Sequence, residues 1–315
     1  MSGPVKVVVA LGGNALEDKA LPPTAQSQLQ VARRTANYLA QLSCAGYELA
    51  VVHGNGPQVG RILLASETAA EVTPPMPFDV CGAMSQGYIG YHLQQALTDA
   101  LKEKKRNIPV VTVVTQMVVD KNDPAFQNPT KPIGPFYTKE QADTLSAQKG
   151  YTMKEDSGRG WRRVVPSPKP RRIVEIGTIR TLWDTTVSIA CGGGGIPVIE
   201  KEDATLEGIA AVIDKDLAAC ELAQEMEADI LMILTEVPAV AINFGKPDQT
   251  DLGEVTADQL DSYAAEGQFG AGSMLPKVQA AVEFVRSAPG RRAIITSLDL
   301  GLEALAGRCG TRIRG

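Results

Sequence analysis

The chain has 315 residues, a formal net charge of −5, and a hydrophobic fraction of 44%. This length provides one large domain or two ordinary ones, each with a substantial core. The acidic balance argues against a nucleic-acid partner, whose usual mark is a basic face. No run resembles a signal peptide or reaches transmembrane length, so we expect a cytoplasmic protein that does not bind membranes.

Cysteine and histidine are too few and too scattered for a metal centre. The five cysteines never form a Cys-x-x-Cys pair, which favours buried thiols in a reducing compartment over disulfides or zinc. The two histidines are His53 and His92. We interpret His53 as the end of a strand and His92 as a packed residue of a helix.

Residues 5–11 form an apolar, β-branched run that is typical of a buried parallel strand. Gly12, Gly13 and Asn14 follow it. Two glycines after a strand let the backbone turn tightly and bring its N–H groups close to a ligand, and the asparagine adds a donor and an acceptor. An ordinary strand-ending turn is the alternative at this stage.

The same pattern returns further along the chain. A helix is predicted at 26–45 and a strand at 47–53, which ends in Gly54, Asn55 and Gly56. A long helix at 79–104 is crowded with small residues, so we expect a close helix neighbour, either in the same chain or in a second subunit.

The composition changes between residues 120 and 165, a stretch that is polar and interrupted by prolines. A stretch of this length without core periodicity, inside a compact domain, is more typical of a functional lobe or lid than of a plain loop. Lys131 lies in this stretch between two prolines, which restrict the backbone.

An α/β rhythm resumes after the lobe. We predict helices at 176–185 and 215–225, and strands at 187–191, 229–234 and 292–296. Strands alternating with helices predict a mostly parallel sheet covered on both sides. A third glycine-rich turn, which includes Gly193 and Gly194, follows the strand at 187–191. Three such turns at one sheet edge favour a phosphate cradle.

Two lysines stand near predicted helix starts. Lys215 and Asp216 follow Asp214, a plausible N-cap, and Lys277 follows a glycine-rich segment. Phosphoryl transfer depends mainly on positioning and on positive charge around the moving group. Asp216 can hold both ammonium groups and help to seat a hydrated Mg²⁺. Solvated surface charges are the alternative interpretation of either lysine alone.

Two nucleotide-binding motifs fit the sequence less well. Residues 54–60 nearly match the Gly-x-Gly-x-x-Gly turn of dinucleotide-binding proteins, but the acidic residue expected after the next strand is missing. No Gly-x-x-x-x-Gly-Lys-Ser/Thr run occurs, which excludes a P-loop enzyme.

The order of the motifs resembles the carbamate kinases of the amino-acid kinase superfamily. The blocks that carry the resemblance are residues 10–15, 53–60, 81–87, 128–137, 158–168, 192–197, 211–217, 243–248 and 272–277. The resemblance implies a three-layer αβα sandwich with a mainly parallel central sheet: one amino-acid kinase domain over residues 1–315, with a protruding lid subdomain inserted at 120–165. It also implies reversible phosphoryl transfer between ADP and carbamoyl phosphate, giving ATP and carbamate. Further implications are Mg²⁺ carried by the nucleotide, a cytosolic homodimer and a place in arginine catabolism.

The same resemblance implies catalytic and binding roles for individual residues. The catalytic set is Lys131, Lys215, Asp216 and Lys277; the phosphate-binding set is Gly12, Gly13, Asn14, Gly54, Asn55, Gly56, Gly193 and Gly194; and the nucleotide-binding set is Asp214, Thr235, Val237 and Met274. Lys131 would reach down from the lobe towards carbamoyl phosphate. Two other hypotheses remain: a kinase of the same superfamily that acts on an amino acid, and a catalytically inactive member that senses nucleotide.

Overall fold

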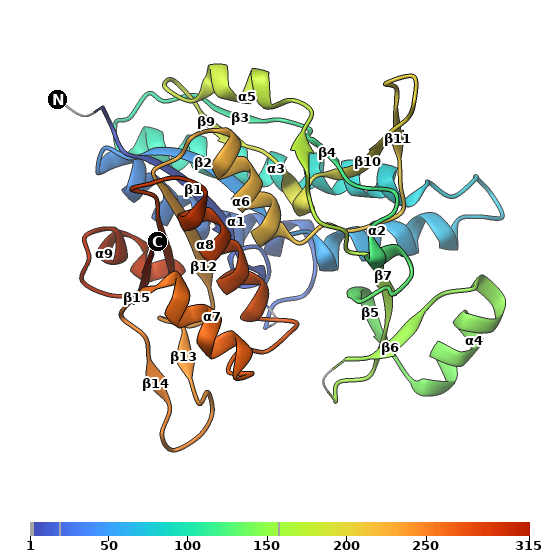
Figure 1. Ribbon diagram of the computed structural model, residues 1–315. Coiled ribbons are helices and arrows are strands. Elements are labelled where there is room, and N and C mark those ends of the chain that lie inside the picture. The colour runs from blue at the N-terminus through green and yellow to red at the C-terminus, as the bar shows by residue number, and fades with distance from the viewer. Residues whose placement is uncertain (1–2, 19, 157) are drawn as a thin grey trace.

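The computed structural model describes residues 3–18, 20–156 and 158–315, and the side chain of Asn14 lies outside this description. A central sheet organises the chain (Figure 1). Its strand order is β15-β17-β16-β12-β1-β2-β9-β3. The strands are β1 Lys6–Leu11, β2 Glu48–His53, β3 Val110–Thr112, β9 Val187–Ile189, β12 Ile230–Thr235, β15 Glu254–Thr256, β16 Arg292–Ser297 and β17 Thr311–Arg314.

The sheet is mainly parallel, as the sequence predicts. Strand β1 pairs in parallel with β2 on one side and with β12 on the other. Strand β9 continues the parallel run beyond β2, and β16 continues it beyond β12. Strands β16 and β17 pair antiparallel. Parallel pairing places the carboxyl ends of β1, β2 and β9 at one edge of the sheet.

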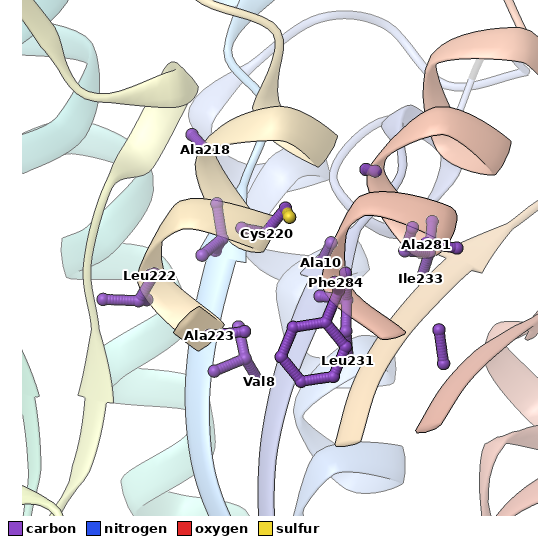
Figure 2. Packing of buried hydrophobic residues seen from close by; sticks show 14 of the residues in the cluster. Val8, Ala10, Ala218, Cys220, Leu222, Ala223, Leu231, Ile233, Ala281 and Phe284 are labelled. Atoms are coloured by element: carbon purple, nitrogen blue, oxygen red, sulfur yellow. The ribbon is translucent and has the colours of Figure 1, made fainter. Parts of the chain in front are cut away.

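Helices cover both faces of the sheet. They are α1 Ala25–Cys44, α2 Gly56–Thr68, α3 Phe78–Glu103, α4 Lys139–Lys149, α5 Ile176–Leu182, α6 Lys215–Glu225, α7 Ala257–Ala265, α8 Leu275–Ser287 and α9 Gly301–Leu305. Val8 and Ala10 of β1 pack in one core with buried residues of α6 and α8, such as Leu222 and Phe284 (Figure 2). Alternate residues of β1, including Val9, pack in a second core with α1 and α3. The predicted three-layer αβα sandwich is confirmed.

Two smaller sheets extend this body. One has the order β11-β10-β4-β8 and lies beside α3; its strands are β4 Gln116–Val118, β8 Arg172–Ile173, β10 Ile196–Glu200 and β11 Leu206–Gly208. The other has the order β5-β7-β6 and stands out from the body together with α4 (Figure 1). Its strands are β5 Lys131–Tyr137, β6 Met153–Glu155 and β7 Trp161–Val165. This unit covers residues 131–165 of the predicted stretch 120–165, and it alone is called the lobe below. A short hairpin, β13 Ala241–Ile242 and β14 Thr250–Asp251, completes the strands.

The small residues of α3 do not have one common cause. A Cβ at Gly90 would overlap the side chain of Thr112 in β3, so Gly90 lets the helix approach a strand of its own chain. The expected close helix neighbour is therefore wrong for Gly90. Gly87 has no atom within 4 Å of an added Cβ and faces outward. Among the described residues, no helix is both long and apolar enough to cross a bilayer.

Candidate active site

One large cavity opens where the three glycine-rich turns meet. Its volume is about 570 Å³, within the range of small-molecule sites. The predicted site residues that line it are Gly12, Gly13, Gly54, Asn55, Gly56, Lys131, Gly193, Asp214, Lys215, Asp216, Thr235, Val237, Met274 and Lys277. Gly194 is not among the lining residues, and an added Cβ there would overlap the Ile213 carbonyl. The side chain of Asn14 lies outside the described part of the chain.

The glycines of the turns serve different purposes. Gly193 has φ +68, and a Cβ there would overlap the Asn55 amide, so the residue allows two turns to pack together. Gly13 and Gly56 have no atom within 4 Å of an added Cβ. Helix α2 starts at Gly56, and no side chain caps its N-terminus. Its first N–H groups therefore suit an anion that approaches from the cavity.

A layer of buried polar residues holds these turns from behind. Gln86 of α3 donates to the carbonyls of Thr115 and Gly192, at 3.0 and 2.8 Å, and its carbonyl accepts from Thr115 N at 2.8 Å. The His53 Nδ1 lies 2.8 Å from the Gly54 carbonyl oxygen. Burial lowers the pKa of His53 to about 4, so the ring is neutral and Nδ1–H donates to Gly54.

Asn55 belongs partly to this layer as well. Its side chain is 6% exposed and donates from Nδ2 to the Ser85 hydroxyl oxygen at 2.8 Å. The amide nitrogen therefore fastens the turn to α3, and this contact is a structural function that the sequence did not suggest. Gln86 and Thr115 were also not predicted as site residues, although Gln86 lies in the motif at 81–87 that resembles the carbamate kinases.

Two lysines share one buried carboxylate at the floor of the cavity. Lys215 Nζ lies 2.8 Å from Asp216 Oδ1, and Lys277 Nζ lies 2.9 Å from Asp216 Oδ2. The Asp216 side chain is only 2% exposed. Lys215 comes from the start of α6 and Lys277 from the start of α8, so the carboxylate joins two helix N-termini. The alternative of solvated surface charges is wrong for both lysines.

Burial and neighbouring charges act in opposite directions on the two lysines. Burial alone would lower the pKa of Lys215, but Asp216 and Asp214 outweigh it and raise that pKa above 10.5. The pKa of Lys277 is lowered, first by burial and then by the nearby Lys215, although Asp216 opposes the change. Asp216 is thus the group that keeps two ammonium ions together in a largely water-excluded place.

A third lysine reaches the cavity from the lobe. Lys131 Nζ lies 2.6 Å from Asp214 Oδ2, while Asp214 Oδ1 caps α6 by accepting from Asp216 N at 2.9 Å. Burial would raise the pKa of Asp214, but Lys131 and Lys215 hold it well below its usual value, so the carboxylate is charged. The Lys131 side chain remains 34% exposed. It is the most exposed of the three lysine side chains, since those of Lys215 and Lys277 are each 14% exposed.

Apolar side chains line the cavity as well: Val237, Ala241, Phe244, Phe269 and Met274, together with the polar Thr235 and Gln268. Phe244 is 67% exposed on the β13–β14 hairpin. Flat apolar surfaces with a few polar groups suit an aromatic ring, whereas the lysines suit phosphates. The cavity therefore has the polarity of a nucleotide.

The donor set does not form a protein cage for a metal ion. No group of three or more His, Cys, Asp or Glu side chains with metal-binding geometry occurs in the described ranges. Both oxygens of Asp216 already accept from lysines. A Mg²⁺ at this site fits best on the phosphates of a nucleotide, with Asp216 at most in its outer sphere.

Comparisons with known proteins agree with this geometry. The model of the amino acid kinase family matches residues 5–297. A carbamate kinase of Clostridium perfringens is 54% identical over 313 residues, which are 98% of this chain and 99% of the relative. One of Thermococcus kodakarensis is 53% identical over 312 residues, 98% of each.

A solved structure extends the likeness to three dimensions. The carbamate kinase of Giardia lamblia bound to AMP-PNP superposes with a TM-score of 0.91 at 46% identity, and the match covers 99% of both chains. The likeness therefore extends over nearly the whole length of both chains. The chain belongs to the amino acid kinase family and, within it, to the carbamate kinases.

Proposed function

We propose that this enzyme transfers a phosphoryl group between carbamoyl phosphate and ADP, giving carbamate and ATP, and that it also runs in reverse. The observation that carries this is the Lys215–Asp216–Lys277 bridge in a cavity that the three glycine-rich turns and Lys131 also line. The apolar side chains of the cavity would contact the adenine, and the lysines the phosphates.

The chemistry follows from where the charges lie. A moving phosphoryl group spreads negative charge over its oxygens, and fixed ammonium and N–H groups stabilise that charge. Lys215 and Lys277 are oriented by one buried carboxylate, so they need little rearrangement. We propose direct in-line transfer without a covalent intermediate, because positioning and charge suffice. Mg²⁺ would enter with the nucleotide and shield its phosphates.

We propose that the lobe acts as a lid and that Lys131 meets the carbamoyl phosphate side. Its present partner is Asp214, and an incoming phosphate would compete for the same ammonium group. Lys131→Ala should lower kcat/KM for carbamoyl phosphate by about 10²-fold, as for the loss of one preorganised electrostatic group. The Kd for ADP should change by less than about fivefold, since the core holds the nucleotide.

The decisive assay is ATP formation from ADP and carbamoyl phosphate, with glutamate and aspartate plus ATP run beside it. Turnover on an amino acid and not on carbamoyl phosphate would favour the other kinase hypothesis. Nucleotide binding without turnover on any substrate would favour the sensor hypothesis. The intact lysine set argues against the sensor.

We also propose a cytosolic homodimer that works in arginine breakdown, as carbamate kinases typically do. The outer face of α3 supports the assembly. Val80, Met84 and Tyr91 are exposed there at 37, 49 and 60%, on one side of the helix with Gly87 among them. Val114, two residues after the end of β3, a strand that contacts α3, is also exposed, at 52%. Such an apolar stripe suits a twofold-related copy of itself.

A further inference from the structure

The lobe contacts the core at a second place, far along α2 from the cavity. Three lobe side chains converge there on Glu67. Lys149 Nζ lies 2.7 Å from Glu67 Oε2, the Tyr151 hydroxyl donates to Oε1, and an Arg163 nitrogen lies 3.6 Å from Oε1. The Arg163 guanidinium stacks over the Tyr151 ring, 3.7 Å from its centroid. We call these four residues the Glu67 anchor.

The anchor is built more tightly than a surface ion pair. The Glu67 side chain is 17% exposed and that of Arg163 is 21% exposed. Burial would raise the pKa of Glu67, but hydrogen bonds from Lys149 and Tyr151 lower it overall, so the carboxylate is charged. Burial and the Glu67 hydrogen bond raise the pKa of Tyr151 to about 12, so its hydroxyl stays a donor. Partly buried networks of this kind fix geometry better than isolated exposed pairs.

A close backbone contact lies between the anchor and the cavity. Gly60 of α2 faces Gly134 of β5, and a Cβ at Gly60 would overlap the Gly134 backbone. Helix α2 starts at the phosphate turn with Gly56 and ends at Thr68, one residue beyond Glu67. Strand β5 starts with Lys131. On α2, Gly60 thus lies between the phosphate turn and Glu67, and on β5 its contact Gly134 lies three residues after Lys131.

We propose that Glu67 is a positioning residue that fixes the orientation of the lobe, so that Lys131 faces the phosphoryl site. The proposal rests on the proposed role of Lys131. Since α2 rises about 1.5 Å per residue, Glu67 lies about 16 Å along the helix from Gly56. A small rotation of the lobe about the Gly60–Gly134 contact would displace Lys131, and misplacement by about 1 Å can reduce a rate 10²-fold.

The test is a double-mutant cycle on turnover. Glu67→Gln keeps the size of the side chain and removes the charge that Lys149 and Tyr151 contact by hydrogen bonds and Arg163 by an ion pair. We expect it to lower kcat/KM for carbamoyl phosphate about tenfold and to leave the Kd for ADP within twofold. If Glu67 acts through Lys131, then Lys131→Ala and the double variant should have the same kcat/KM within about twofold. Asp143→Asn is the matched control, because Asp143 pairs only with Lys139 on the exposed surface of the lobe among the interactions described.

Each outcome decides something. Normal kinetics for Glu67→Gln, with a strong Lys131→Ala defect, overturn the role of Glu67 alone. Multiplicative losses in the double variant also overturn it, because Glu67 would then act independently of Lys131. Near-normal turnover of Lys131→Ala refutes the proposed role of the lysine and the positioning role with it. If Glu67→Gln folds poorly, Tyr151→Phe replaces it in the test, because it keeps the ring and removes one donor to Glu67. We expect this variant to lower kcat/KM for carbamoyl phosphate about threefold and to show the same dependence on Lys131.

Discussion

Replacing Asp216 by asparagine should separate nucleotide binding from phosphoryl transfer. The carboxylate is 2% exposed and accepts from two ammonium groups at 2.8 and 2.9 Å. The amide keeps one acceptor and turns a donor towards the other lysine, so one contact survives and one becomes repulsive. Breaking one side of a buried ion pair costs about 3–5 kcal/mol, and we expect the lower end. At about 2.1 cal/mol/K per residue, a chain of 315 residues unfolds with an entropy of about 0.66 kcal/mol/K, so a loss of about 3 kcal/mol should lower Tm by about 5 °C.

The kinetic effect should exceed the effect on binding. Lys215 and Lys277 lose their common orientation, so kcat should fall by about 10²-fold or more. The Kd for ADP should change by less than about tenfold, because both lysines still line the cavity and can contact the phosphates. Losing the carboxylate also lowers both lysine pKa values, so the alkaline limb of the rate profile should move to lower pH.

The assays are coupled ATP formation over pH, ADP calorimetry and thermal unfolding. The control is Asp258→Asn, which removes the carboxylate of an ion pair with Arg286. The Asp258 side chain is 92% exposed and does not line the cavity. A kcat within threefold of the parent enzyme would refute the view that Asp216 organises the lysines. An unchanged Tm would show that the buried pair contributes little to the fold.

Three further predictions concern acid stability, magnesium and assembly. The pKa of His53 is about 4 in the folded protein and about 6.5 in the unfolded chain. The neutral ring therefore contributes fully to the free energy of unfolding above pH 6.5, and this contribution declines as the pH falls. About 2 kcal/mol of the free energy of unfolding should be lost between pH 8 and pH 5. Urea unfolding of His53→Gln should show a shallower acid loss, and an identical slope would contradict this. Mg²⁺ titrated without nucleotide should give no saturable binding at micromolar concentration by calorimetry, whereas tight binding would reveal a protein cage for the ion. Gly87→Trp should shift the light-scattering mass towards monomer with the fold retained, whereas Gly90→Trp should unfold the chain against Thr112; a folded dimer of the Gly87 variant would exclude this face.

Local patterns in the sequence were enough to predict the parallel strands that border the cavity, but not β15 and β17 at one end of the central sheet. Residues 5–11 are predicted as a strand because a run of β-branched residues is typical of a buried strand, and β1 occupies Lys6–Leu11. The glycine turns were predictable because their edge follows from parallel pairing. Gln86 was not, since its partners lie 29 and 106 residues away and no local pattern reports them. Gly90 was misassigned for the same reason: a small residue in a helix says that something is close, but not what it is.

The lysines of the cavity hold two different carboxylates, and this difference supports the proposed role of the lobe as a lid. Lys215 and Lys277 share Asp216, and their side chains are each only 14% exposed. Lys131 instead holds Asp214, a carboxylate that already has a second task as the cap of α6. When a phosphate replaces Asp214 as the partner of Lys131, Asp214 keeps Lys215 as a neighbouring positive charge and loses none of its capping contact. The exchange would therefore leave no buried charge without a partner, and the proposed closure of the lobe would not disturb the Lys215–Asp216–Lys277 bridge.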